Sequence, residues 1–488
     1  MIKSRRILSL LMSVALVTGV LSGCGNVETK GEESASSQKE QTVATEEEKQ
    51  ETEVEKSDKE ATEVLEVSVW SHDGSIDSVL SPLIEEFNAT TGKEEGIEIN
   101  YLLNGDMNTM LDLGHENNEL PLLANKKGGT TYEEGGMMVP ISYLPGGQEF
   151  IDEWGKKTGG YSQTNKISGS DEIYAPSYTV TGAAVYYNKD MFVEAGIVDE
   201  NGEAKAPTSW SELLEYAEIL TNGNTYGLAL QLGWGSCTDY AVIRNAFNYT
   251  EEMPFTFDWD NQEVTVNCSE PLETVAKIYQ NGYCVPGAES IDNDMARGYF
   301  AEGVAGMYFG YSWDIGVYTT NYTTDFEWGV SWLKADDGTD HGMMLASSNF
   351  INPTAAVMEL SEEDQKKVMT VIKWFYSEEV GVPLTEAGLI FPANSEFAEK
   401  ADKSNLLPQV VDYMDAMSKG RHSNIPSSFL GNVLVGDANG TKYLNNSVVA
   451  LCKGEKTLDE TVNSINEVFT ASFKEQIAGG SLNPEDWK

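Results

Sequence analysis

The sequence is poor in the residues on which most enzymes rely for catalysis and metal binding. It contains 4 histidines and 5 cysteines in 488 residues. It has no HExxH, GxSxG or GxxxxGK[ST] motif and no GxGxxG motif after a strand. The cysteines are far apart and lack metal-ligand spacing. We therefore expect no metal site, no cofactor and no enzymatic activity.

Positive charge is also scarce. The chain carries 32 basic against 78 acidic residues, a formal net charge of −46 at pH 7. A surface this acidic repels phosphate backbones, which argues against a nucleic-acid partner. It argues equally against an anionic ligand, because no local basic cluster is evident beyond Lys126-Lys127 and Lys156-Lys157.

The apolar run near the N-terminus, residues 7–20, is too short to span a bilayer as a stable helix. Three basic residues precede it, and Leu21-Ser22-Gly23-Cys24 follows it, which looks like a bacterial lipobox. This pattern predicts a lipoprotein signal peptide over 1–23 and a lipid on Cys24, which would anchor the protein to the extracytoplasmic face of the cell membrane. The alternative is an ordinary secretory signal with a chance cysteine.

Residues 24–63 cannot build a core. Residues 25–63 hold 13 acidic and 5 basic side chains and no aromatic residue. Such a composition predicts a disordered acidic tether behind the lipidated cysteine.

The rest of the chain, about 425 residues, exceeds what one hydrophobic core usually serves. Strand and helix patterns alternate from residue 64, with a strand over 64–70, a helix from 77 and a strand over 97–101. We therefore expect an α/β protein with two lobes.

The segment 172–197 carries the most specific pattern of the chain. A glycine hinge at Gly182 precedes a strand over 183–187 that reads as buried on both faces. A turn at Asn188-Lys189-Asp190 then leads to a short helix ending at Ala195-Gly196. The stretch resembles the extracellular solute-binding proteins of ABC sugar importers, the family-1 group that includes maltose-binding proteins.

Further motifs of that family recur, with gaps, over most of residues 64–470. They are P-x-x-W-x-E-L at 207–213, a stretch similar to F-x-x-G-x-A-M at 300–307, a stretch similar to G-x-W at 310–313, an apolar segment ending in proline at 388–392, and a closing helix pair near 448–462. Around 104–130 the chain departs from the family pattern, so ligand contacts cannot be transferred there.

The resemblance implies a two-lobed periplasmic-binding-protein-like fold of type II, with hinge crossings near 178–182, 343–347 and 393–400. The implied lobes are 64–178 plus 348–395, and 179–347 plus 396–488. The implied function is that of the substrate-binding lipoprotein of an ABC importer. It would capture a carbohydrate, expected to be an oligosaccharide, and deliver it to the permease subunits as a monomer.

Aromatic residues next to polar ones at strand ends are the best candidates for ligand contacts. Sugars stack their CH faces on aromatic rings and hydrogen-bond through their hydroxyls. The candidates, with a tyrosine at the first crossing, are Trp70, His72, Asp73, Tyr178, Trp234, Tyr311, Trp313 and Asp314.

Two other functions remain open from the sequence: a surface-anchored glycoside hydrolase and a ligand-sensing lobe of a membrane receptor. The state of the four other cysteines is open as well. Cys268 and Cys284 flank a predicted helix and are candidates for a disulfide, whereas buried free thiols are the simpler interpretation.

Overall fold

The computed structural model describes residues 64–125, 135–158, 165, 173–320, 322–422, 425 and 429–484. The predicted signal peptide (1–23), the lipid site Cys24 and the tether (24–63) lie outside the described residues. Within the described ranges, no helix combines the length and the apolar composition needed to cross a bilayer.

The first sheet has the order β12-β3-β1-β2. Its strands are β1 (Leu65–Ser71), β2 (Ile97–Leu103), β3 (Leu123–Asn125) and β12 (Asn352–Pro353). β1 runs parallel to β2 and β3, and β12 runs antiparallel to β3. Alternate residues of β1, such as Val67 and Val69, are fully buried because successive side chains point to opposite faces. The strands predicted over 64–70 and 97–101 are confirmed.

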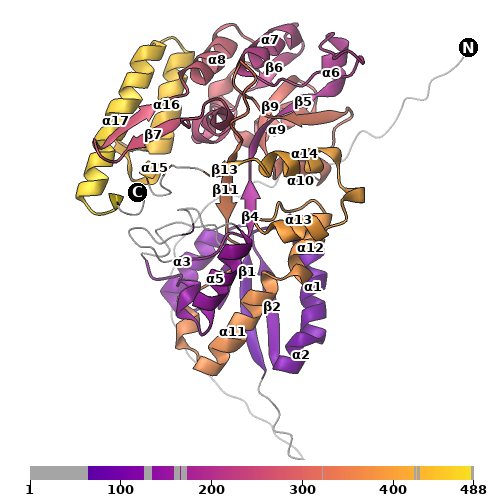
Figure 1. Ribbon diagram of the computed structural model, residues 1–488, viewed down its shortest axis with the longest axis vertical. Helices are drawn as coiled ribbons and strands as arrows, with labels where there is room; N and C mark the ends of the chain where they lie inside the picture. Colours follow the sequence, from indigo (N-terminus) through magenta and orange to yellow (C-terminus); the bar gives the residue numbers. More distant parts are fainter. Residues whose placement is uncertain are drawn as a thin grey trace, which may run out of the picture. The chain divides into compact units, whose positions relative to one another are not determined.

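Helices from two distant stretches of chain surround this sheet (Figure 1). They are α1 (Asp77–Ala89), α2 (Thr91–Glu95), α3 (Met107–Asn117), α5 (Gly147–Lys157), α11 (Glu362–Phe375), α12 (Glu378–Glu386) and α13 (Ser395–Lys400). Short 3-10 turns add Ile141–Tyr143 and Ala355–Glu359. Their buried side chains form one core, which draws on residues 67–178 and 350–397.

The second sheet has the order β10-β5-β9-β6. Its strands are β5 (Ala183–Asn188), β6 (Tyr226–Ala229), β9 (Ala305–Tyr311) and β10 (Trp328–Ser331). β5 is antiparallel to β9 and β10, and β6 is parallel to β9. Every residue of β5 is buried, as the continuous run of small and apolar residues predicts.

The helices and hairpins of this second part follow in chain order. The helices are α6 (Lys189–Glu194), α7 (Trp210–Leu220), α8 (Ser269–Gln280), α9 (Asn293–Ala301), α10 (Asp314–Thr320), α14 (Pro408–Met417), α15 (Phe429–Asn432), α16 (Gly440–Cys452) and α17 (Leu458–Ala478). The hairpins are β7 (Phe255–Asp258) with β8 (Glu263–Val266), and β14 (Leu434–Val435) with β15 (Ala438–Asn439). A π-helical turn covers Thr238–Ile243, and 3-10 turns cover Asn245–Asn248, Ala288–Ser290 and Lys403–Asn405.

Between the two sheets, short segments pair with one another and form a hinge ribbon. β4 (Thr179–Thr181) is antiparallel to β11 (Met344–Ser348), and β13 (Arg421–His422) is parallel to β11. On the other side of β4, the Val180 N–H donates to the Phe391 carbonyl and the Ala393 N–H donates to the Tyr178 carbonyl, both at 2.8 Å. The hinge ribbon therefore consists of β13, β11, β4 and residues 391–393.

The lobe boundary near the third crossing lies later than the sequence suggested. Phe397 of α13 is buried in the first core, where its ring lies 5.9 Å from that of Trp154. We therefore place α13 with the first lobe and extend that lobe beyond residue 395, to about Lys400. The other boundaries drawn from the sequence stay proposals.

Candidate functional site

Three loops of the second lobe meet at one edge of its sheet. β6 and β9 are parallel and β10 is antiparallel to β5, so the carboxyl ends of β6, β9 and β10 lie beside the amino end of β5. β5 begins directly after the hinge strand β4, so this is the edge nearest the hinge. Residues that follow β6, β9 and β10 are placed there together. Such an edge is where open α/β sheets usually bind ligands.

After β9, two aromatic rings are stacked. The centroids of Tyr311 and Trp313 lie 4.1 Å apart with an interplanar angle of 6°. Tyr311 is 1% exposed, whereas Trp313 is 38% exposed. One face of the Trp313 indole is thus covered by Tyr311, and much of the remainder is open to solvent. A flat ring held in this way is a suitable platform for the CH face of a sugar.

Two more rings extend this stack into an aromatic cluster, which consists of Trp234, Tyr240, Tyr311 and Trp313. The Tyr240 ring lies 5.8 Å from Tyr311, edge to face, and 5.3 Å from the half-buried Trp234. Tyr240 comes from the π-helical turn Thr238–Ile243, which follows the loop after β6.

A buried ion pair supports the aromatic cluster from behind. The Arg244 guanidinium lies 3.6 Å above the Tyr240 ring, and its Nη2 is 3.6 Å from Oδ2 of Asp239. Burial raises the pKa of Asp239, and the charge of Arg244 opposes that rise. Because the two charges offset each other, the pair presents no unbalanced charge to a ligand.

Asp314 does not have the surface that a ligand contact needs. It is fully buried, Oδ1 accepts from the Arg297 Nε–H at 2.9 Å, and Oδ2 accepts from the Tyr311 N–H at 2.8 Å. Our expectation that Asp314 contacts ligand is corrected here. Both of its carboxylate oxygens accept hydrogen bonds from within the protein, at the turn that carries Tyr311 and Trp313. Its role is to position that turn.

Tyr178 is likewise buried, at 1% exposed. Its ring stacks on Phe350, 4.4 Å away at 13°, and meets Tyr376 edge to face at 5.2 Å. The ring packs in the first core at the start of the hinge, so we correct its expected ligand contact to a packing role. Its hydroxyl has no hydrogen-bond partner among the described residues.

In the first lobe, Trp70, His72 and Asp73 lie together at the carboxyl end of β1, as the sequence predicts. His72 Nδ1 lies 2.8 Å from the carbonyl of Asn125, the last residue of the parallel neighbour β3. Asp73 Oδ1 accepts from the Ser75 N–H at 3.2 Å. Trp70 packs partly against the first core. All three side chains keep some exposed surface.

Sequence reasoning missed two aromatic residues, Tyr240 and Trp332, at the hinge edge of the second sheet. Tyr240 lies in a helical turn and not at a strand end, so the strand-end rule did not find it. Trp332 directly follows β10 and would have been found, had the short strand Trp328–Ser331 been recognised. Its indole N–H has no partner in the described structure, and it lines a polar pocket of about 250 Å³ with Asn248, Lys334 and Asp412.

Neither metal-binding clusters nor disulfides occur in the described part of the chain. No three His, Cys, Asp or Glu side chains come close enough there to hold a metal ion. Cys237, Cys268, Cys284 and Cys452 are buried free thiols. The disulfide between Cys268 and Cys284 that the sequence left open is absent from this structure.

Residues 83–409 match the model of the bacterial extracellular solute-binding protein family, and the chain belongs to that family. Its members are binding proteins that work outside the cytoplasm. The match confirms the family that the sequence predicted, and the solved structures that share the fold confirm its two-lobed α/β architecture.

Solved structures share the fold at low sequence identity. The cyclic alpha-maltosyl-1,6-maltose binding protein from Arthrobacter globiformis is 17% identical, with a TM-score of 0.61 over 84% of this chain and 100% of the other. A maltose/maltodextrin-binding domain from Bdellovibrio bacteriovorus, bound to maltotriose, is 15% identical, with a TM-score of 0.59 over 85% and 100%. An ABC transporter solute-binding protein from Thermotoga lettingae, bound to alpha-D-tagatose, is 15% identical, with a TM-score of 0.60 over 84% and 100%. No curated protein sequence matches the chain.

Proposed function

We propose that this protein is the substrate-binding lipoprotein of an ABC importer and that it captures an uncharged carbohydrate between its two lobes. It delivers the sugar to the permease subunits and acts as a monomer. A lipid on Cys24 holds it at the extracytoplasmic face of the cell membrane. Family membership and the sugar-binding proteins that share the fold support this class of function.

The observation that carries the proposal is the exposed Trp313 ring supported by the buried Tyr311 ring. The supporting ring fixes the indole plane, so a ligand that stacks on it loses little side-chain entropy. Burying such a ring against a sugar contributes on the order of 1–3 kcal/mol. Trp234 offers a second partly exposed ring in the same aromatic cluster.

The charges of the second-lobe site favour a neutral ligand. Asp239 offsets the buried Arg244, and Arg297 offsets the buried Asp314. Neither the Arg244 nor the Arg297 charge is therefore free to hold a carboxylate or a phosphate ligand, and the acidic surface repels both kinds of ligand. Hydrogen bonds to sugar hydroxyls would come from His72 and Asp73 in the first lobe, since none of the described residues donates to Oδ2 of Asp73.

We further propose that the protein binds its sugar without chemical change. This separates it from the surface glycoside hydrolase that the sequence left open. Incubation of each bound oligosaccharide with excess protein, followed by chromatography, should recover the sugar intact. Shorter products that disappear when an aspartate or glutamate at the site is replaced would instead establish a hydrolase.

Titration calorimetry against a panel of sugars tests the proposal. For the sugar that binds, Trp313→Ala and Trp234→Ala should each weaken binding by about tenfold to a hundredfold. Trp259→Ala is the matched control, because Trp259 packs on Phe473 of α17 by an edge-to-face contact, outside the aromatic cluster. Affinity should change little with salt or chelator, since the ligand is uncharged. Normal binding by both cluster variants, together with a steep salt dependence, would refute the carbohydrate assignment.

A further inference from the structure

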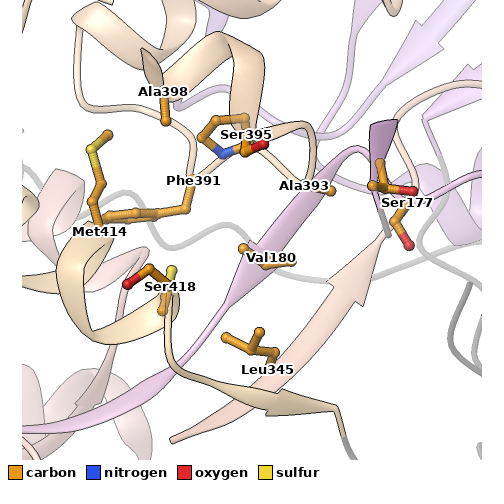
Figure 2. Close-up of a pocket in the computed structure, with 12 residues that line it drawn as sticks. Ser177, Val180, Leu345, Phe391, Ala393, Ser395, Ala398, Met414 and Ser418 are labelled. Carbon is orange, nitrogen blue, oxygen red and sulfur yellow. The ribbon is translucent and has the colours of Figure 1, made fainter. Parts of the chain in front are cut away.

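A second pocket lies at the hinge, and none of the predicted ligand-binding residues lines it. Its volume is about 230 Å³. Figure 2 shows it between β4, β11, the segment 391–393 and the helices α13 and α14. The pocket therefore touches the hinge ribbon and one helix from each lobe, because α13 packs in the first core and α14 contributes Val410 and Tyr413 to a core of the second lobe.

The hinge ribbon presents one of its faces to this pocket. Val180 of β4 and Leu345 of β11 are both pocket-lining residues. They lie on the same face, because Val180 pairs with residue 347 and side chains two apart share a face. Their neighbours Thr179, Thr181 and Met344 point to the opposite face. An occupant of the pocket would therefore contact one face of the hinge ribbon directly.

The lining is apolar with a few hydroxyls. Eight of the twelve lining residues are apolar, the other four are serine or threonine, and none is charged. Because the wall carries no charged side chain, it disfavours a charged occupant. Met414 and Met417 supply flexible thioether side chains, which adapt to ligands of different shape.

The hydroxyls set a further requirement on the occupant. The Ser177 hydroxyl already donates to Oδ1 of Asn165 at 2.7 Å, and the Ser418 hydroxyl donates to the Asp415 carbonyl at 2.6 Å. Their protons are committed, so each oxygen has only acceptor capacity left. A ligand that gains a hydrogen bond at either of these two oxygens must bring its own N–H or O–H donor.

From these observations we propose that the hinge pocket binds a small, neutral, largely apolar molecule that carries one hydrogen-bond donor. A cavity of about 150 Å³ lined by apolar side chains is sufficient for benzene, so this pocket has room for a fused bicyclic ring. The binding claim does not depend on the proposed sugar-binding function.

Occupancy of the pocket is linked to the position of the lobes. One wall, Ala398 on α13, moves with the first lobe, and another, Met414 on α14, moves with the second. A rotation about the hinge ribbon changes the distance between these walls. A molecule that fits one width binds that lobe arrangement better, and by linkage it favours it. This second claim rests on the proposed function, since lobe closure is part of sugar capture.

Indole is the probe for the first claim, and 1-methylindole, which lacks the N–H, is its matched partner. Binding to the full-length protein is measured by ligand-observed NMR titration. Indole should bind, and Ala398→Phe, which fills the pocket from α13, should weaken it by about tenfold or more. Ala471→Phe, the same change at an exposed position of α17, should leave it unchanged. Circular dichroism checks that both variants are folded.

A separate variant tests whether the ligand donates a hydrogen bond to the Ser418 oxygen. Ser418→Ala should weaken indole by about two- to fivefold and leave 1-methylindole unaffected, because only indole donates to that oxygen. Failure of indole to bind up to its solubility limit, or equal binding by the Ala398→Phe variant, would overturn the site.

The linkage claim is tested separately, with the sugar identified by calorimetry. Saturating indole should change sugar affinity by at least about twofold in the wild type and not at all in the Ala398→Phe variant. If indole binds at the pocket and sugar affinity stays constant in both, the pocket is a binding site without influence on the hinge. If no sugar binds at all, the proposed function fails and the binding site stands.

Discussion

Removal of the Asp314 carboxylate should damage the fold more than any other single change at the candidate site. Asp314 is fully buried, and its partner Arg297 has a side chain only 14% exposed. Asp314→Ala would leave a buried guanidinium without its main counter-charge and the Tyr311 N–H without its acceptor. Breaking a buried pair on one side costs about 3–5 kcal/mol, because the remaining charge stays desolvated.

The chain offers a matched control on the same guanidinium. Asp294 also pairs with Arg297, at 2.8 Å, but its side chain is 73% exposed. Exposed pairs contribute about 0–1 kcal/mol, so Asp294→Ala should have little effect. Urea unfolding followed by circular dichroism gives both free energies of unfolding. The double variant Asp314→Leu/Arg297→Met should recover much of the loss, since it buries no charge.

The result also decides between two roles for Asp314. A positioning residue predicts a large loss of stability, and a loss of sugar affinity that follows from the displaced Trp313. If Asp314→Ala unfolds no more easily than Asp294→Ala and yet abolishes sugar binding, then Asp314 contacts the ligand, and our structural assignment is refuted.

Four further outcomes are expected from features described above. Because burial raises the pKa of the thiols of Cys268, Cys284 and Cys452 to about 12 from an ordinary value of 9.0, iodoacetamide at pH 8 should not label them until the protein is unfolded. By the same shift, stability present below pH 9 should decline as the pH rises toward 12, which urea unfolding at several pH values would show; rapid labelling of the native protein would contradict the burial. Cys24→Ala should release the protein from the membrane fraction, and retention of that variant would indicate another anchor. Small-angle scattering should show a smaller radius of gyration with bound sugar, and an unchanged radius despite tight binding would argue against lobe closure.

The sequence predicted the main strands because their burial leaves a direct pattern. β5 is a continuous run of small and apolar residues, and β1 alternates, so period and composition identify both. The N-terminus of α7 also follows a local pattern: the Ser209 hydroxyl accepts from the N–H of Glu212, three residues later. The position of Trp313 at the end of β9 could likewise be predicted from the sequence.

Other site features depend on partners that no local pattern reveals. An aspartate next to a tryptophan suggested a sugar contact. Instead, the Asp314 carboxylate accepts a hydrogen bond from Arg297, which lies 17 residues earlier in the chain. Arg244 and Tyr240 support Tyr311 from a turn about 70 residues away. The hinge pocket has walls from five separate stretches of chain, so only the folded structure brings it together.

The split origin of the first core has a consequence for biosynthesis and export. Its N-terminal part, residues 67–178, lacks β12, α11 and the buried side chains of residues 350–397 until about 170 further residues have been made. Those intervening residues contain the whole second sheet, which is local in sequence and can form earlier. The first lobe to emerge is therefore completed only after the second sheet has been made, and the second core in turn waits for α16 and α17. Until residues 350–397 have been made, the first lobe stays incompletely packed. A translocation channel for unfolded chains requires this state, and exposed strand edges invite aggregation in it.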